Sequence, residues 1–114
     1  MPASAVSMTV RWCVPLGESR SLTEALHWVM MGARSSPGCL RCSVSTHVSE
    51  KVGVEYVEEW ATEDLLRREV RTDRFRSLAT IMEHATTRPV VEFVLPGGAR
   101  GLEYADEVLS ATDR

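Results

Sequence analysis

Alternating apolar and polar residues predict four strands, at residues 6–14, 39–48, 54–61 and 89–95. A period of two places successive side chains on opposite faces of a sheet, so each predicted strand has one face that is more apolar than the other. A short turn that contains Gly53 separates the second and third segments, as in a β-hairpin. The apolar positions of the first segment are Met8, Val10, Trp12 and Val14.

Apolar residues at helical spacing predict helices between these strands. The first helix begins at a capping serine, Ser19 or Ser21, and ends near residue 34. In the second helix Thr62 is the predicted N-cap, because its hydroxyl can accept a hydrogen bond from a backbone N–H of the first turn. This second helix breaks near residues 72–73 and resumes with Phe75.

The order of these elements predicts the fold. Strand, helix, strand, strand, helix and strand form the split β-α-β-β-α-β arrangement, a ferredoxin-like α+β fold with a four-stranded antiparallel sheet and its helices on one face. Two such sheets can pack face to face, which predicts a homodimer in the form of a dimeric α+β barrel. We expect one domain over residues 1–95. The break Pro96-Gly97-Gly98 opens an extension over residues 96–114, which either docks on the partner subunit as a short helix or frays.

Net charge and hydropathy argue against two classes of protein, nucleic-acid binders and membrane proteins. The 114 residues carry 13 Lys and Arg against 16 Asp and Glu, a net charge of −3, whereas nucleic-acid binders usually carry a basic excess. No apolar run approaches the roughly 20 residues that span a bilayer, and the first seven residues are too short and polar for a secretory signal. We therefore expect a cytoplasmic protein that binds neither nucleic acid nor a membrane.

Three short motifs resemble the antibiotic biosynthesis monooxygenase family. They are Pro37-Gly38-Cys39-Leu40, Glu59-Trp60-Ala61-Thr62, and Leu65-Leu66 followed by Phe75. The resemblance covers about residues 6–95 and implies a small dimeric α+β barrel. Members of this family include haem-degrading enzymes and cofactor-independent oxygenases of quinol or polyketide aromatics. In the oxygenases the carbanion of the substrate reduces oxygen, so the resemblance implies no cofactor.

The sequence also departs from the family pattern. Trp60 matches the tryptophan that lines the family's pocket between the sheet and the helices. Nine residues later many members have a histidine, where this chain has Glu69, and Asp73-Arg74 stands where Pro-His often precedes the helical phenylalanine. The asparagine of the haem-degrading branch would fall near Val10. These departures argue against haem degradation.

Five residues form the predicted site. Tyr56, Glu58 and Trp60 share one strand face and are predicted to bind a flat aromatic substrate. Glu69 and Arg74 are predicted catalytic residues, since a buried carboxylate can accept a proton from a phenol and a guanidinium can stabilise the anion. Two alternatives stay open: Trp60 could simply fill the core, and the arginines near Arg74 could line a solvated helix face. The predicted function is accordingly a cofactor-independent monooxygenase of a small electron-rich aromatic, or a non-catalytic small-molecule-binding or regulatory module.

Cysteine and histidine positions predict no metal site. Cys39 and Cys42 form a C-x-x-C motif, but residues three apart in a regular strand point to opposite faces, where they cannot share a metal ion or a disulfide. The three histidines, His27, His47 and His84, lie on separate predicted elements. We interpret the cysteines as packing residues.

Overall fold

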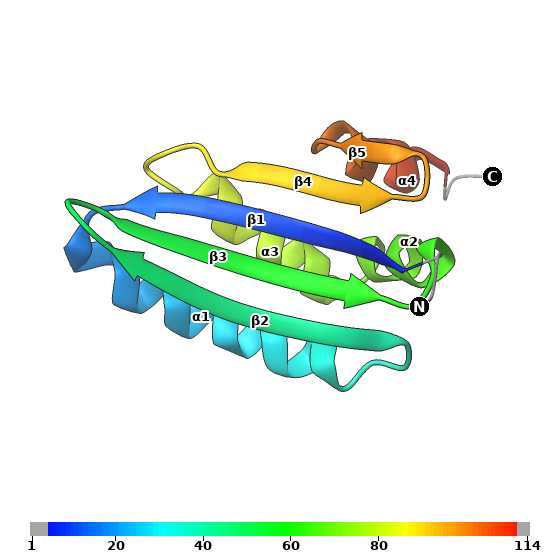
Figure 1. The fold of residues 1–114 in the computed structure, drawn as a ribbon, viewed down its shortest axis with the longest axis horizontal. Coiled ribbons are helices and arrows are strands. Elements are labelled where there is room, and N and C mark those ends of the chain that lie inside the picture. Colours follow the sequence, from blue (N-terminus) through cyan, green and yellow to red (C-terminus); the bar gives the residue numbers. More distant parts are fainter. Residues whose placement is uncertain (1–4, 112–114) are drawn as a thin grey trace.

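The computed structural model describes residues 5–111 as one sheet with helices packed against it (Figure 1). The predicted domain limits at residues 1 and 114 lie outside the described residues. The strands are β1 (Val6–Val14), β2 (Cys39–Val48), β3 (Val52–Trp60), β4 (Val90–Leu95) and β5 (Gly98–Arg100). The helices are α1 (Leu16–Arg34), α2 (Glu63–Val70), α3 (Asp73–Glu83) and α4 (Glu103–Ala111). None of these helices is long and apolar enough to cross a membrane.

The sheet confirms the α+β class and corrects the number of strands. Its order is β2-β3-β1-β4-β5, and every neighbouring pair is antiparallel. The predicted count of four strands is wrong, because β5 adds a fifth strand beside β4. The predicted break at residues 96–98 is the turn of this hairpin, in which Gly98 adopts a φ of 129° that side-chain-bearing residues rarely adopt. The homodimer and the barrel stay predictions.

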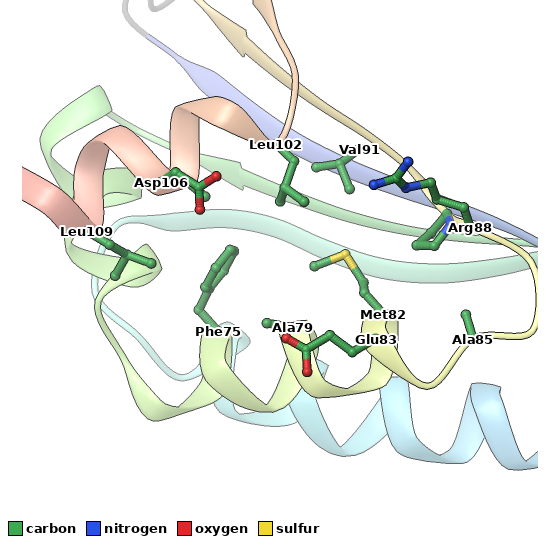
Figure 2. Close-up of a pocket in the computed structure, with 12 residues that line it drawn as sticks. Phe75, Ala79, Met82, Glu83, Ala85, Arg88, Val91, Leu102, Asp106 and Leu109 are labelled. Atoms are coloured by element: carbon green, nitrogen blue, oxygen red, sulfur yellow. The ribbon is translucent and has the colours of Figure 1, made fainter.

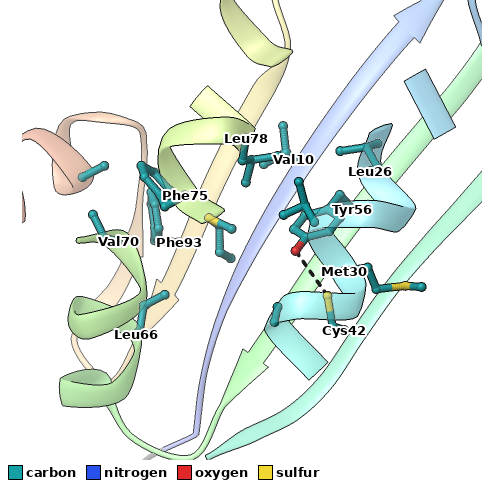
Figure 3. Packing of buried hydrophobic residues seen from close by; sticks show 14 of the residues in the cluster. Val10, Leu26, Met30, Cys42, Tyr56, Leu66, Val70, Phe75, Leu78 and Phe93 are labelled. Carbon is teal, nitrogen blue, oxygen red and sulfur yellow. Dashed lines mark hydrogen bonds between the residues drawn. The ribbon is translucent and has the colours of Figure 1, made fainter. Parts of the chain in front are cut away.

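The core lies between the helices and one face of the sheet. The even-numbered residues of β1 and β3 point to this face, and all of them are buried, as the alternation predicts. Figure 3 shows Val10 of β1 close to Leu26 of α1 and Leu78 of α3. The same face carries Tyr56, so burial of the core also positions the predicted site.

Capping explains where the helices begin. Thr62 accepts a hydrogen bond from the backbone N–H of Leu65 at 3.2 Å, which confirms it as the N-cap of α2. Thr72 caps α3 in the same way through Phe75, so the predicted break separates two helices. The predicted start of α1 at a serine is wrong, since that helix already begins at Leu16 with no side-chain cap.

A β-bulge at the start of β2 changes the direction of two side chains. Cys39 pairs with Trp60, but Arg41 pairs with Glu59 and Cys42 with Glu58, so the register shifts between the first two of these pairs. The extra residue in β2 restores the helix-facing orientation at Cys42. Cys39 and Cys42 therefore lie on the same face, and the prediction that they point to opposite faces is wrong because it assumed a regular strand.

The C-terminal extension packs on its own chain. Tyr104 of α4 stacks at a tilt against Phe93, with 5.0 Å between the ring centroids. Its hydroxyl donates a hydrogen bond to Glu63 of α2 at 2.8 Å. Whether the exposed side of this extension, which includes Leu102, also meets a partner subunit stays a prediction.

Candidate functional site

Four side chains form a hydrogen-bonded chain on the helix-covered face of β2 and β3. The Cys42 thiol donates to the Tyr56 hydroxyl at 3.3 Å, a contact drawn in Figure 3. The Tyr56 hydroxyl donates to Glu58 Oε2 at 2.5 Å, and Trp60 Nε1 donates to Glu58 Oε1 at 3.0 Å. Alternation along β3 aligns three of these residues, and the cross-strand pair Cys42–Glu58 adds the fourth. We call these four residues the Glu58 cluster.

Burial gives the Glu58 carboxyl an unusual proton affinity. Only 1% of Glu58 is exposed, and its pKa is raised from 4.5 to about 7, with loss of hydration as the largest cause. The negative charge of Glu69 also raises this pKa, while the hydrogen bonds from Tyr56 and Trp60 and the charge of Arg74 partly offset the rise. A carboxyl with a pKa near 7 can exchange a proton at neutral pH, as a general base requires.

Glu69 and Arg74 form an ion pair near this cluster. Arg74 Nη2 lies 2.8 Å from Glu69 Oε1, and Arg74 Nε lies 3.2 Å from Glu69 Oε2. The guanidinium also donates to the Ser36 hydroxyl at 2.7 Å, which connects α3 to the segment after α1. Only 3% of Glu69 is exposed, so Arg74 compensates a buried charge and does not lie on a solvated helix face.

A hollow of about 370 Å³ lies at the edge of the sheet and shares Cys42 with the Glu58 cluster. The other side chains around it come from the end of α1 and the bulged start of β2. They are Arg34, Cys39, Leu40 and Arg41. The hydrogen-bonded chain of the cluster thus ends at Cys42, one of the residues around this hollow.

Comparison with known proteins identifies the fold of this chain but no sequence family that matches it. No protein-family model matches the chain, and no curated protein matches it. Solved structures do match: a protein from Shewanella oneidensis is 17% identical over 80% of this chain and 89% of its own, with a TM-score of 0.70. A candidate antibiotic biosynthesis monooxygenase from Caulobacter crescentus is 18% identical over 79% of this chain and 87% of its own, with a TM-score of 0.68. Another such candidate, from Nitrosomonas europaea, is 13% identical over 88% of this chain and 91% of its own, with a TM-score of 0.66.

The chain has the fold of the antibiotic biosynthesis monooxygenases. The resemblance that the sequence motifs indicated is confirmed at the level of the fold. Identities of 13–18% show this fold alone and leave the substrate open.

A larger cavity lies on the side of the C-terminal extension. It is a partly open space of about 660 Å³ between α3, β4 and α4, within the range of roughly 300–1,000 Å³ that ligand pockets occupy. Figure 2 shows Phe75 and Met82 of α3 pointing into the cavity, with Leu102 and Val91 across from them. The charged residues that line it are Glu83, Arg88 and Asp106.

The sequence predicted part of this arrangement. Tyr56, Glu58 and Trp60 lie together as predicted from their alternation, with at most 2% of each exposed. Cys42 was missed as their partner because a β-bulge leaves no pattern in the residue types. The cavity was missed because α4 closes it, and the predictions placed the extension outside the domain.

Proposed function

We propose that this protein is a cofactor-independent monooxygenase of a small electron-rich aromatic molecule, with Glu58 as the proton acceptor. The observation that carries the proposal is a buried carboxyl whose pKa is raised to about 7 and whose oxygens are held by two aromatic residues. Perturbed carboxyls of this kind are frequent at catalytic sites. The fold shared with candidate monooxygenases supports the same reaction class.

The reaction requires only a base and oxygen. Glu58 accepts a proton from the substrate, and the resulting carbanion reduces dioxygen and forms a carbon–oxygen bond with it. Cleavage of the oxygen–oxygen bond leaves one oxygen atom in a product carbonyl and releases the other as water, with the proton held by Glu58. In the keto tautomer of a quinol, a ring methylene supplies all four electrons, so the overall conversion of CH₂ and O₂ into C=O and H₂O is balanced.

The other four predicted residues support Glu58. Trp60 and Tyr56 hold the carboxylate in one orientation, and their rings, which are at most 2% exposed, would contact a substrate once the covering side chains move. Both oxygens of Glu69 are bonded to Arg74, which favours Glu58 over Glu69 as the base. The positive charge of Arg74 lowers the pKa of Glu58 and would also favour an anionic intermediate. Because Glu58 is 1% exposed, a substrate reaches it only after the covering side chains move.

The second candidate function is binding of a small molecule without turnover. Two observations favour it: the oxygens of Glu58 already have hydrogen-bond donors, and the cavity between α3, β4 and α4 needs no rearrangement. In this alternative the Glu58 cluster is a satisfied polar part of the core.

Oxygen uptake with a panel of quinols separates the two functions. We expect the metal-stripped wild type to consume oxygen, and we expect Trp60→Phe to lower the rate at neutral pH about tenfold, because loss of a hydrogen bond worth about 1.5–3 kcal/mol raises the pKa of Glu58 and leaves less of it as carboxylate. The variant should also shift the pH–rate midpoint upward, since the bond from Trp60 lowers the pKa of Glu58. Trp28→Phe is the matched control, because Trp28 is 71% exposed.

If a quinol of the same panel raises the melting temperature of the protein while no oxygen is consumed, the result supports the second function, binding without turnover. Equal rates in wild type and Trp60→Phe would contradict the role of the Glu58 cluster.

A further inference from the structure

The bulge in β2 brings two thiols to one surface. Cys39 and Cys42 both face the helices, and both line the hollow at the sheet edge. The Cys39 thiol donates to the carbonyl oxygen of Arg41 at 3.6 Å, two residues further along the strand. Both cysteines are free, and negative charge on Cys39 raises the pKa of Cys42, as expected for neighbouring sulfurs.

Two cysteines beside one hollow favour a particular class of ligand, although the Cys42 thiol must first turn away from the Tyr56 hydroxyl. Thiolate sulfur is a soft donor that favours soft cations such as Cu(I). Zinc usually takes four protein ligands in structural sites, and no group of three or more His, Cys, Asp or Glu residues in the range 5–111 could hold a metal ion. A monovalent soft cation, which is satisfied by two sulfurs in a line, fits two cysteines better.

We propose that Cys39 and Cys42 bind one thiophilic monovalent cation, of the Cu(I) or Ag(I) class, in the hollow at the start of β2. Cys39 is only partly buried and receives the cation first, and the buried Cys42 thiol completes the coordination after it leaves the Tyr56 hydroxyl. The site shares Cys42 with the Glu58 cluster, but it does not depend on the oxygenase proposal, because neither Glu58 nor Trp60 binds the cation.

The positively charged side chains around the hollow compensate the net charge of the site with its cation bound. Each thiol releases a proton on binding, so two thiolates and one monovalent cation carry a net charge of −1. Arg34 and Arg41 line the same hollow, and Arg34 Nε donates to the carbonyl of Cys42 at 2.9 Å, which fixes a positive charge close to the site. Tyr56 loses the hydrogen bond from the Cys42 thiol but keeps its own bond to Glu58.

Because protons compete with the cation for the two sulfurs, the affinity of the site for the cation depends on pH. Thiols have a pKa of about 8.5, so both cysteines are protonated at neutral pH. Since binding then displaces two protons, the apparent affinity should rise about 100-fold for each unit of pH.

Competition for Cu(I) against a coloured chelator tests the proposal with the reduced full-length chain. We expect the wild type to bind one Cu(I), and we expect Cys39→Ser and Cys42→Ser each to weaken binding at least about 100-fold, since each removes one of the two donors. Cys13→Ser is the matched control: Cys13 is exposed on the opposite face of the sheet, and its loss should leave the affinity unchanged.

The Cys39→Ser variant keeps the test decisive if Cys42→Ser fails to fold, because Cys39 is only partly buried. Ag(I) titration with X-ray absorption should report two sulfur neighbours per cation in the wild type. Wild-type affinity in Cys39→Ser, or loss of binding in Cys13→Ser, would overturn the site.

Discussion

Replacement of Arg74 by methionine is expected to lower the free energy of unfolding by about 3 kcal/mol, because it leaves the Glu69 carboxylate charged and unpaired inside the protein. Glu69 is 3% exposed, and Arg74 makes two hydrogen bonds to it. The variant also loses the bond to Ser36 that connects α3 to the segment after α1. Urea denaturation of the two proteins at the same pH measures the difference.

The neighbouring pair between Arg76 and Asp73 provides the control. It lies on the surface of α3, with side chains that are 79% and 93% exposed, so Arg76→Met should cost less than about 1 kcal/mol. The double variant Glu69→Met/Arg74→Met should recover most of the lost stability, because no buried charge remains. If Arg74→Met costs no more than Arg76→Met, the Glu69–Arg74 pair does not stabilise the fold as we describe.

The wild type is expected to lose stability between acid and neutral pH, and the Glu58→Gln variant is expected to keep it. Burial raises the pKa of Glu58 from 4.5 to about 7, so in this window the folded state binds more protons than the unfolded state. Stability therefore falls as pH rises from 4.5 to about 7 and stays low above it. At about 1.4 kcal/mol for each unit of pKa, Glu58 accounts for about 3 kcal/mol of this loss.

A glutamine can preserve the hydrogen bonds of the cluster. Its carbonyl oxygen can accept from Trp60, and its amide can donate to Tyr56, whose hydroxyl can turn towards Cys42. Unfolding free energies at about pH 5 and pH 8 should differ less in Glu58→Gln than in the wild type. Glu59 lies on the face of β3 that points away from the helices, so Glu59→Gln should keep the wild-type dependence of stability on pH. A Glu58→Gln protein that loses as much stability as the wild type would show that Glu58 has an ordinary pKa.

The sequence pattern correctly predicted the strands and helix caps that depend on interactions between residues close together in the chain. Alternation placed β1 and β3 well because the helices bury every even-numbered residue of both strands. Thr62 was recognisable as an N-cap because its role depends on a residue three positions away. The grouping of Tyr56, Glu58 and Trp60 followed from their spacing along a single strand.

Features that depend on distant contacts could not be predicted. The start of β2 looks like a regular strand, and only its pairing with Trp60 and Glu58 reveals the bulge that aligns Cys39 with Cys42. The fifth strand has only three residues, too few for a recognisable period, and its pairing with β4 defines it. The ion pair of Glu69 depends on how α3 turns after Thr72, which the helical pattern of the arginines does not encode.

Oxygen uptake by Glu58→Gln at neutral pH shows whether Glu58 is the catalytic base. We expect the wild type to consume oxygen with at least one quinol, with a rate that rises with pH to half its maximum near pH 7, the pKa of Glu58. In the folded variant the rate should fall at least about 100-fold, because general-base catalysis contributes about 10²–10⁴-fold. A folded Glu58→Gln protein that consumes oxygen at the wild-type rate would contradict the assignment of Glu58 as the base.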